Sequence, residues 1–180
     1  MLRTVLLFFW LLVGLPALGA PPSMERLTPA AGQRGTEFPI RVTGSGLARV
    51  SQVLFYDDSV RCTKITALSD NELQLSLQSD AGAQPGPRAF RVQSPEGLSE
   101  LLVVSLTALP TAAELEDNNS PETAQTIPLN TTVVGTIDDG DADCFRVTLG
   151  QGQRLSVEAE AIRSGGAMFD AVVNIFSPDG

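Results

Sequence analysis

The feature that most constrains this chain is an alternation of apolar and polar side chains with a period of two residues. It is plain in "EFPIRVTG" (37–44), "NELQLSLQ" (71–78) and "RAFRVQ" (88–93), which are separated by turn sequences such as "TPAAGQRG" (28–35) and "TGSGL" (43–47). A period of two is typical of half-buried antiparallel strands, and short strands between Gly and Pro turns are typical of a small β-sandwich. The face expected to be buried carries Phe38, Ile40, Val42, Leu73, Leu75, Leu77, Phe90 and Val92.

The charge of the chain is divided unevenly. Residues 1–110 contain nine Lys and Arg and nine Asp and Glu, whereas residues 111–180 contain three basic and twelve acidic residues and so account for the whole net charge of −9. The change falls in the polar stretch "TALPTAAELEDNNSPETAQ" (107–125), which breaks the alternation. Such an asymmetry favours two modules joined by a linker. The excess of acid also argues against nucleic acid as a partner, since phosphates need basic groups.

The predicted fold is all-β, with two small β-sandwich modules. We expect the first at 25–107, an acidic linker at 108–120, and the front part of a second sandwich at 121–180. The alternation resumes in this last range at "TVVGTI", "CFRVTL", "RLSVEAEAI" and "DAVVNIFS". The second module is expected to be incomplete, because a sandwich needs about 100 residues and the sequence stops at the turn "SPDG" (177–180).

The N-terminal segment has the pattern of a signal peptide. Arg3 supplies the positive charge, "VLLFFWLLVGL" (5–15) the apolar region, and "ALG" (17–19) a small-x-small cleavage signal. We therefore expect a signal peptide at 1–19, with an uncleaved anchor as the alternative. The mature protein is then secreted or held at the cell surface, without a membrane span after cleavage.

Several residue types limit the possible chemistry. Histidine is absent, which excludes Ser-His-Asp and Cys-His catalysis and His-ligated zinc, and removes the commonest general base. Cys62 and Cys144 lie far apart without a CxxC spacing, so each is expected to be an unpaired buried thiol, with a bridge as the alternative. Phe55, Tyr56 and Phe169 are interpreted as core or strand-end aromatics in preference to a sugar platform.

Four aspartates lie within "TIDDGDADCF" (136–145). Asp139, Asp141 and Asp143 have the first three ligand spacings of an EF-hand, but Cys144 replaces the glycine at position 6 and Gly150 the glutamate at position 12. The stretch is therefore not an EF-hand. A catalytic carboxylate pair needs two groups held across a cleft, one of them in an apolar pocket, and adjacent aspartates on a glycine turn do not suit that role.

A composite calcium site is the better-motivated hypothesis for these aspartates. Calcium takes six to eight oxygens from carboxylates, amides and backbone carbonyls. Alternate positions of an extended linker project to one side, so the linker oxygens and those of the aspartate turn could face one ion. The alternative is that the linker is merely polar and the aspartates are turn formers. The candidate ligands are Glu114, Glu116, Asn118, Asn119, Asp141 and Asp143.

Two family resemblances follow from longer motifs. The stretch "RLTPAAGQRGTEFPIRVTGSGLARVSQVLF" (26–55) resembles the opening of an IPT/TIG-type immunoglobulin-like domain. Its turn glycines, Gly44 and Gly46, are expected to take positive φ, and Leu47 to enter the core. The resemblance implies an Ig-like sandwich over about 25–107.

The stretch "AELEDNNSPETAQTIPLNTTVVGTIDDGDADCFRVTLGQGQRLSVEAEA" (113–161) is similar to the bacterial pre-peptidase C-terminal (PPC) domain. Cys144 departs from the family pattern, which has an aromatic residue there. The similarity implies a jelly-roll-like sandwich, and related collagen-binding modules hold calcium where an acidic linker meets such a turn. The matching residues are Glu114, Glu116, Asn118, Asn119, Ala124, Ile127, Gly135, Ile137, Asp141, Asp143, Phe145, Gly152, Gln153 and Leu155.

The function predicted from the sequence is that of a non-catalytic secreted or cell-surface binding or spacer module, stabilised by calcium. The module order resembles that of large secreted proteins of planctomycete-like bacteria. The expected partner is an extracellular matrix, polysaccharide or protein surface. The alternative is an accessory targeting region of a secreted peptidase or hydrolase whose catalytic domain lies beyond residue 180.

Overall fold

The computed structural model describes residues 19–137, 140–161 and 171–177. Apart from Gly19, the predicted signal peptide lies outside these residues, as do Asp138, Asp139 and Phe169. The described part of the chain is all-β, and its one helical element is a 3-10 turn, η1 (Leu47–Arg49). Within that part, no helix is long and apolar enough to cross a membrane.

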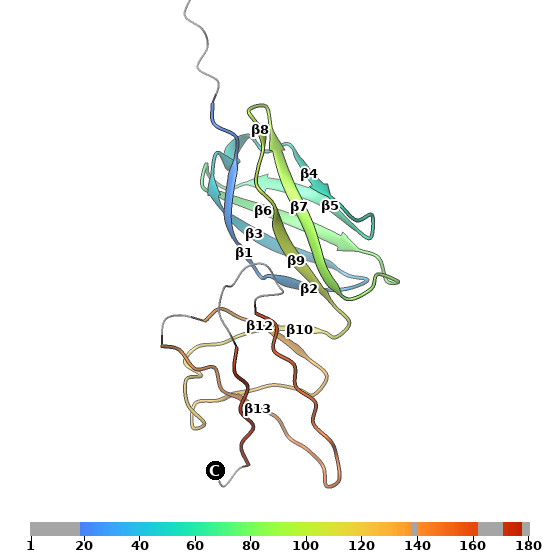
Figure 1. The fold of residues 1–180 in the computed structure, drawn as a ribbon, viewed down its shortest axis with the longest axis vertical. Helices are drawn as coiled ribbons and strands as arrows, with labels where there is room; N and C mark the ends of the chain where they lie inside the picture. The colour runs from blue at the N-terminus through green and yellow to red at the C-terminus, as the bar shows by residue number, and fades with distance from the viewer. Residues whose placement is uncertain (1–18, 138–139, 162–170, 178–180) are drawn as a thin grey trace, which may run out of the picture.

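Two sheets pack face to face in the first half of the chain (Figure 1). In the first sheet the order is β1-β3-β6-β5, and all its pairs are antiparallel. Its alternating segments became the strands that the pattern predicts, with Phe38 opposite Leu77 and Ile40 opposite Leu75. The strands of this sheet are β1 (Ser23–Thr28), β3 (Glu37–Ser45), β5 (Val60–Ala67) and β6 (Glu72–Ser79).

The second sheet has the order β2-β9-β7-β4, with β8 paired to β7. Its β4–β7, β7–β8 and β7–β9 pairs are antiparallel, whereas β2 and β9 run parallel. The turn predicted at 28–35 therefore contains a short strand, because Ala31–Gln33 finds a free edge beside β9. The strands are β2 (Ala31–Gln33), β4 (Gln52–Phe55), β7 (Gly86–Ser94), β8 (Gly97–Leu98) and β9 (Leu102–Thr107).

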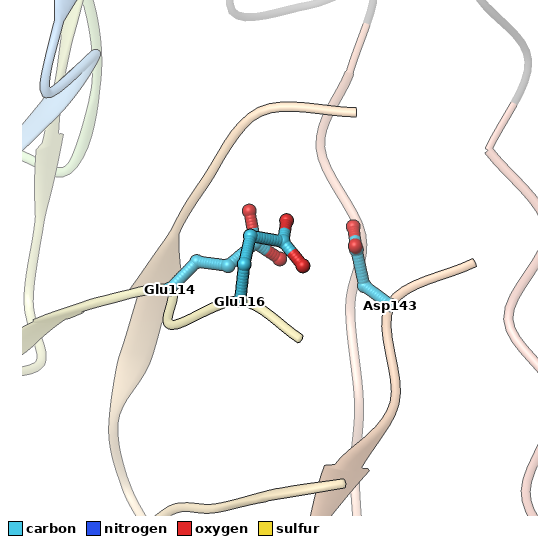
Figure 2. Close-up of side chains that lie close together, drawn as sticks. All are labelled: Glu114, Glu116 and Asp143. Atoms are coloured by element: carbon cyan, nitrogen blue, oxygen red, sulfur yellow. The ribbon is translucent and has the colours of Figure 1, made fainter. Parts of the chain in front are cut away.

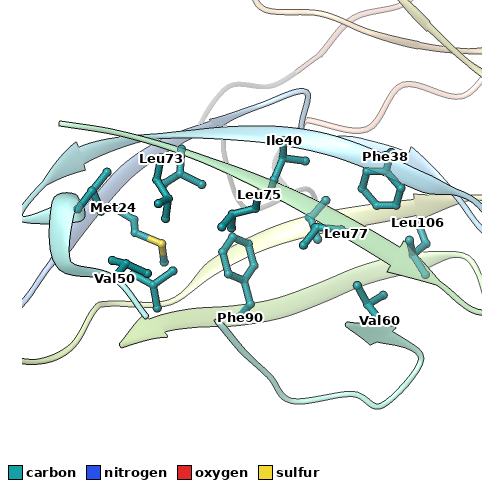
Figure 3. Packing of buried hydrophobic residues seen from close by; sticks show 14 of the residues in the cluster. Met24, Phe38, Ile40, Val50, Val60, Leu73, Leu75, Leu77, Phe90 and Leu106 are labelled. Atoms are coloured by element: carbon teal, nitrogen blue, oxygen red, sulfur yellow. The ribbon is translucent and has the colours of Figure 1, made fainter. Parts of the chain in front are cut away.

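The space between the two sheets is filled by one apolar cluster (Figure 3). Every residue that the alternation assigned to the buried face is buried, and Phe90 stacks at a tilt on Phe55 with ring centroids 5.4 Å apart. Burial of this apolar face is what holds the two sheets together. The cluster comprises Met24, Phe38, Ile40, Val42, Leu47, Val50, Val60, Leu73, Leu75, Leu77, Ala83, Phe90, Val92, Val104 and Leu106.

The two turn glycines have different roles. Gly46 has φ of 67° and precedes Leu47, which is fully buried, as expected. The prediction of positive φ for Gly44 is wrong, because Gly44 lies within β3. A Cβ atom at Gly44 would overlap the carbonyl oxygen of Ser23 on β1, so this position needs glycine for the close approach of the neighbouring strand.

Below the sandwich in Figure 1, the second half of the chain forms two short parallel ladders. One joins β10 (Thr111–Ala113) to β12 (Thr132–Val134), and the other joins β11 (Gln125–Thr126) to β13 (Phe145–Arg146). Strand β10 lies inside 108–120, the range predicted to be the linker.

Strands predicted at 154–162 and 170–177 are not found in their described parts. The first segment keeps an alternating sequence and the second is almost continuously apolar, yet Val172 and Phe176 are 79% and 70% exposed. An alternating segment becomes a strand only where a neighbouring segment bonds its backbone and covers its apolar face. The exposure of Val172 and Phe176 shows that, among the described residues, the apolar side chains of the second segment are not covered.

Candidate metal centre

The part of the acidic linker that follows β10 runs beside β12 before it reaches the aspartate turn. The ladder extends one step beyond β10, because the Glu114 backbone N–H donates to the carbonyl oxygen of Val134 at 3.1 Å. One carboxylate oxygen of Glu114, Oε2, accepts the backbone N–H of Thr136 at 2.9 Å. A Cβ atom at Gly135 would overlap this carboxylate. The glycine of the "GTI" segment therefore makes room for the Glu114 side chain over the β12 backbone.

Backbone bonds bring the linker to the aspartate turn. The N–H of Cys144 donates to the carbonyl oxygen of Asn118 at 2.9 Å, and the Cys144 carbonyl accepts the N–H of Gln125 at the same distance. The Gln125 side chain bonds the linker twice, since its amide donates to the Ala113 carbonyl and its oxygen accepts the Leu115 N–H. Residues 113–118 are thus fixed directly beside the residue that precedes Cys144, which is Asp143.

Three carboxylates meet at this junction (Figure 2). Figure 2 shows Glu114 and Glu116 projecting from the linker toward Asp143, which comes from the opposite segment. One oxygen from each of the three side chains lies within 4.8 Å of the other two. Glu114 and Asp143 are half-buried and Glu116 is exposed. We call these three residues the carboxylate cluster.

Two buried acceptors adjoin the carboxylate cluster without a hydrogen-bond donor among the described residues. They are Oδ1 of Asn118 and Oδ1 of Asp143. Asn118 has no exposed surface, and its Nδ2 donates to Glu114 Oε1 at 3.3 Å. A buried acceptor without a donor costs about 1–3 kcal/mol, so such atoms in a native structure call for a bound ion or water. The atoms that could coordinate a metal here are all oxygens, which suits a hard divalent cation.

The electrostatics of the junction point the same way. The pKa of Asp143 is raised from 3.8 to about 6, chiefly by burial and then by the negative charge of Glu114, a hydrogen bond shared with Glu114, and the charges of Asp141 and Glu116. Crowded carboxylates oppose one another's ionisation. A cation bound between them would reverse that effect, because it favours the ionised form of every ligand.

The structure places the six predicted ligands unequally. Glu114, Glu116 and Asp143 form the carboxylate cluster, and Asn118 reaches it through its bond to Glu114. Asp141 lies near enough to raise the pKa of Asp143, and its own Oδ1 accepts the N–H of Ala142 at 2.9 Å. Asn119 is exposed, and its role as a ligand stays a prediction.

Sequence reasoning missed the residues that hold the junction in place. Gln125, Thr136 and Cys144 contribute through an amide side chain and backbone groups, which leave no mark in composition or spacing. Gly135 carried a signal, since a glycine inside an alternating strand indicates the close approach of another group. Both cysteines are free thiols, as expected, but each is half-buried where a buried side chain was expected. Partial burial raises the pKa of Cys62.

A cavity of about 470 Å³ lies elsewhere in the second half of the chain. Its lining is mixed apolar and polar and includes Leu109, Leu129, Leu149 and Arg154, but none of the carboxylate cluster. The carboxylate cluster therefore lies at the backbone junction and is separate from this cavity, which other residues line.

Comparison with known proteins leaves the family open. No protein-family model and no curated protein matches the chain. SGBP-B from a complex xyloglucan utilization locus in Bacteroides uniformis matches 48% of this chain at 17% identity and a TM-score of 0.34. SGBP-B from the Bacteroides ovatus mixed-linkage glucan utilization locus, solved with a mixed-linkage heptasaccharide, matches 59% at 18% identity and a TM-score of 0.38.

A third match is the titin M10–obscurin-like 1 Ig complex, at 17% identity over 49% of this chain and 93% of that one, with a TM-score of 0.32. The chain spans 22% and 25% of the length of the two SGBP-B proteins. These distant likenesses concern the fold alone and add no argument to the β-sandwich described above. The IPT/TIG and PPC resemblances stay predictions.

Proposed function

We propose that this chain is a non-catalytic binding and spacing part of an exported protein, and that a calcium ion at the carboxylate cluster fixes its linker to the aspartate turn. The N-terminal signal pattern, with Arg3 ahead of an apolar run, supports export. The proposed modules are those predicted from the sequence, with boundaries near residues 107 and 120.

The observation that carries the proposal is the convergence of Glu114, Glu116 and Asp143 within 4.8 Å, together with two buried acceptors, on Asp143 and Asn118, that have no hydrogen-bond donor among the described residues. Three negative groups at this distance repel one another unless a cation lies between them. Calcium suits the set better than magnesium, because it accepts six to eight oxygens in irregular arrangements and magnesium demands a near-ideal octahedron. Glu114, Glu116, Asp143 and the Asn118 amide oxygen would be protein ligands, with Asp141 close by.

Ion binding explains the carboxylate cluster better than catalysis. A glycosidase also pairs a carboxylic acid of raised pKa with a second carboxylate. Such a pair must flank a cleft that admits a substrate, yet Glu114 is committed to the Thr136 N–H and the Asn118 amide. The ion would instead add stability, since it links the segment after β10 to the segment before β13 and neutralises their repulsion.

Thermal unfolding and limited proteolysis with 10 mM calcium, 10 mM magnesium or a chelator test the proposal. Extracellular calcium modules bind with a Kd of about 0.1–1 mM, so about 10 mM calcium should add about 1.4–2.7 kcal/mol and protect the linker from cleavage. Glu116→Gln should lose most of this shift, whereas Glu25→Gln, an exposed change on β1, should keep it. No response to calcium or chelation, or an equal response in both variants, would contradict the proposal.

A further inference from the structure

The two sheets of the first sandwich differ in what they present to solvent. In β4, Val53 and Phe55 pack against the core, so Leu54 and the following Tyr56 point outward. In β7, Phe90 and Val92 are buried, so Arg91 points outward, and it lies opposite Leu54. This outer face, which we call the β4–β7–β9 face, combines apolar side chains with Arg91 and the exposed amides of Gln52 and Gln93. Its apolar residues include Leu54, Leu98 and Val103 in the strands, Tyr56 directly after β4 and Leu101 directly before β9.

The other sheet follows the ordinary pattern for a solvated face. The outward residues of β3 and β6 are mostly polar or charged, and Arg41 pairs with Glu72 at 2.9 Å. On the β4–β7–β9 face, in contrast, Tyr56 is 68% exposed, Leu98 49% and Leu101 41%. Exposed apolar side chains gathered on one face of a small domain mark an interaction site.

Arg91 and Tyr56 give this face its chemistry. Arg91 Nε donates to the Tyr56 hydroxyl at 2.9 Å, and Nη1 donates to the Ser99 carbonyl at 2.6 Å. These neutral acceptors fix the guanidinium beside the aromatic ring. Four other arginines pair with a carboxylate, namely Arg41, Arg49, Arg61 and Arg88. Among the described residues Arg91 has no such pair, so its charge is available to an anion.

The size and charge of the face limit what can cover it. A standard protein interface uses about 20–30 residues on each side, far more than this face offers, so a chain-like ligand fits better than a protein surface. A second copy fits poorly, because a two-fold interface must complement itself and the face carries a cation without a carboxylate. Tyr56 directly follows β4, as expected of a strand-end aromatic, but it is 68% exposed, so the alternative of a sugar platform applies to it. Tyrosine offers a flat apolar ring with a polar edge, which suits the C–H face of a pyranose.

We propose that the β4–β7–β9 face binds a polysaccharide that contains uronic acid, with a sugar ring stacked on Tyr56 and its carboxylate paired with Arg91. A hexuronate carries a sugar ring and a carboxylate on one residue. The 2.9 Å hydrogen bond between Arg91 and Tyr56 holds the guanidinium next to the tyrosine side chain, so one hexuronate could contact both. The negative charge of residues 111–180 opposes such a ligand only weakly, since β4 lies apart from β10–β13 (Figure 1) and charges are screened beyond about 8–10 Å. The inference rests on the proposed binding function and names its ligand class.

Affinity electrophoresis of the whole protein in native gels tests this inference. Polygalacturonate and alginate are the uronic-acid probes, hydroxyethylcellulose has sugar rings without charge, and polyglutamate has carboxylates without rings. The gels contain a chelator, so the carboxylate cluster plays no part and a failure here is separate from a failure of the calcium proposal. At least one uronic-acid probe should retard the protein, and the other two probes should do so weakly or not at all.

Variants assign the retardation to this face. Tyr56→Ala and Arg91→Gln should each weaken binding about tenfold, Arg91→Lys should weaken it less, and Arg41→Gln on the opposite sheet should leave it unchanged. Circular dichroism checks that each variant is folded. The inference is overturned if neither uronic-acid probe binds, if polyglutamate or hydroxyethylcellulose binds equally well, or if Arg41→Gln has the same effect as Arg91→Gln.

Discussion

The substitution Asp143→Asn should have opposite effects with and without calcium. Asparagine keeps the shape of the side chain and removes its charge. Without calcium, the change removes the cost of burying a charged carboxylate and the repulsion from Glu114, Asp141 and Glu116, which together raise the Asp143 pKa, so the junction should become more stable. With calcium, the variant lacks a charged ligand and should gain little.

The size of the effect follows from the pKa of Asp143. Its rise from 3.8 to about 6 would amount to about 3 kcal/mol at neutral pH if none of the charge were screened. Because the side chain is only half-buried, solvent screening reduces the expected gain to about 1–2 kcal/mol. That free energy corresponds to a factor of about 5–30 in the equilibrium for opening of the junction.

Native-state hydrogen exchange at the Cys144 amide measures this opening directly, since that N–H bonds the Asn118 carbonyl. At pH 7 with a chelator, exchange in Asp143→Asn should be about 5–30 times slower than in the parent. Calcium at 10 mM should slow exchange in the parent about 10–100-fold and leave the variant nearly unchanged. Asp58→Asn, outside the carboxylate cluster, serves as the control. Faster exchange in Asp143→Asn without calcium, or an undiminished calcium response, would refute the reasoning.

Three further outcomes are expected. Without calcium, the free energy of unfolding of Asp143→Asn should exceed that of the parent by an amount that grows as pH rises from about 4 to 6 and then levels off. The reason is that the folded Asp143, with its pKa of about 6, binds more protons over this range than the unfolded chain does. Urea unfolding at several pH values measures the difference, and a difference that does not change with pH would contradict the prediction. Gly44→Ala should cost about 1–3 kcal/mol in the same assay, because its Cβ would collide with β1, whereas Gly82→Ala, whose Cβ meets nothing within 4 Å, should be nearly neutral; equal costs would count against the close-approach role. In thermal unfolding, Phe90→Ala should cost about 3–5 kcal/mol and the exposed Tyr56→Ala about 1 kcal/mol or less. A loss for Phe90→Ala no larger than that for Tyr56→Ala would contradict the place of Phe90 in the core.

The first sandwich was predictable because its strands are half-buried. An alternation with a period of two residues predicts which side chains face the core, and every residue assigned in this way is buried. The short strand β2 was not predictable, because Ala31–Gln33 is a strand only through its parallel partner β9, some seventy residues away. The role of Gly44 was misjudged for a similar reason, since the close approach of β1 depends on tertiary structure.

The second half of the chain shows the limit of the same pattern. Segment 154–161 alternates as clearly as β3 does and segment 171–177 is almost continuously apolar, yet neither is a strand in the described residues. Alternation reports the capacity to pair, and pairing also needs a partner edge. For the candidate site, alternate linker positions correctly suggested that Glu114 and Glu116 project together. That Asp143 meets them depends on the bond from Cys144 to Asn118, which the sequence does not encode in any local pattern.

The central claim is that the carboxylate cluster is a cation site whose ligands include Asp143. Calorimetric titration with calcium at pH 6, in two buffers of different ionisation enthalpy, tests it most directly, because a metal must displace the proton from a protonated ligand. With an Asp143 pKa of about 6, the account predicts one calcium per chain and release of about half a proton. Absence of binding, or binding without proton release, would contradict it.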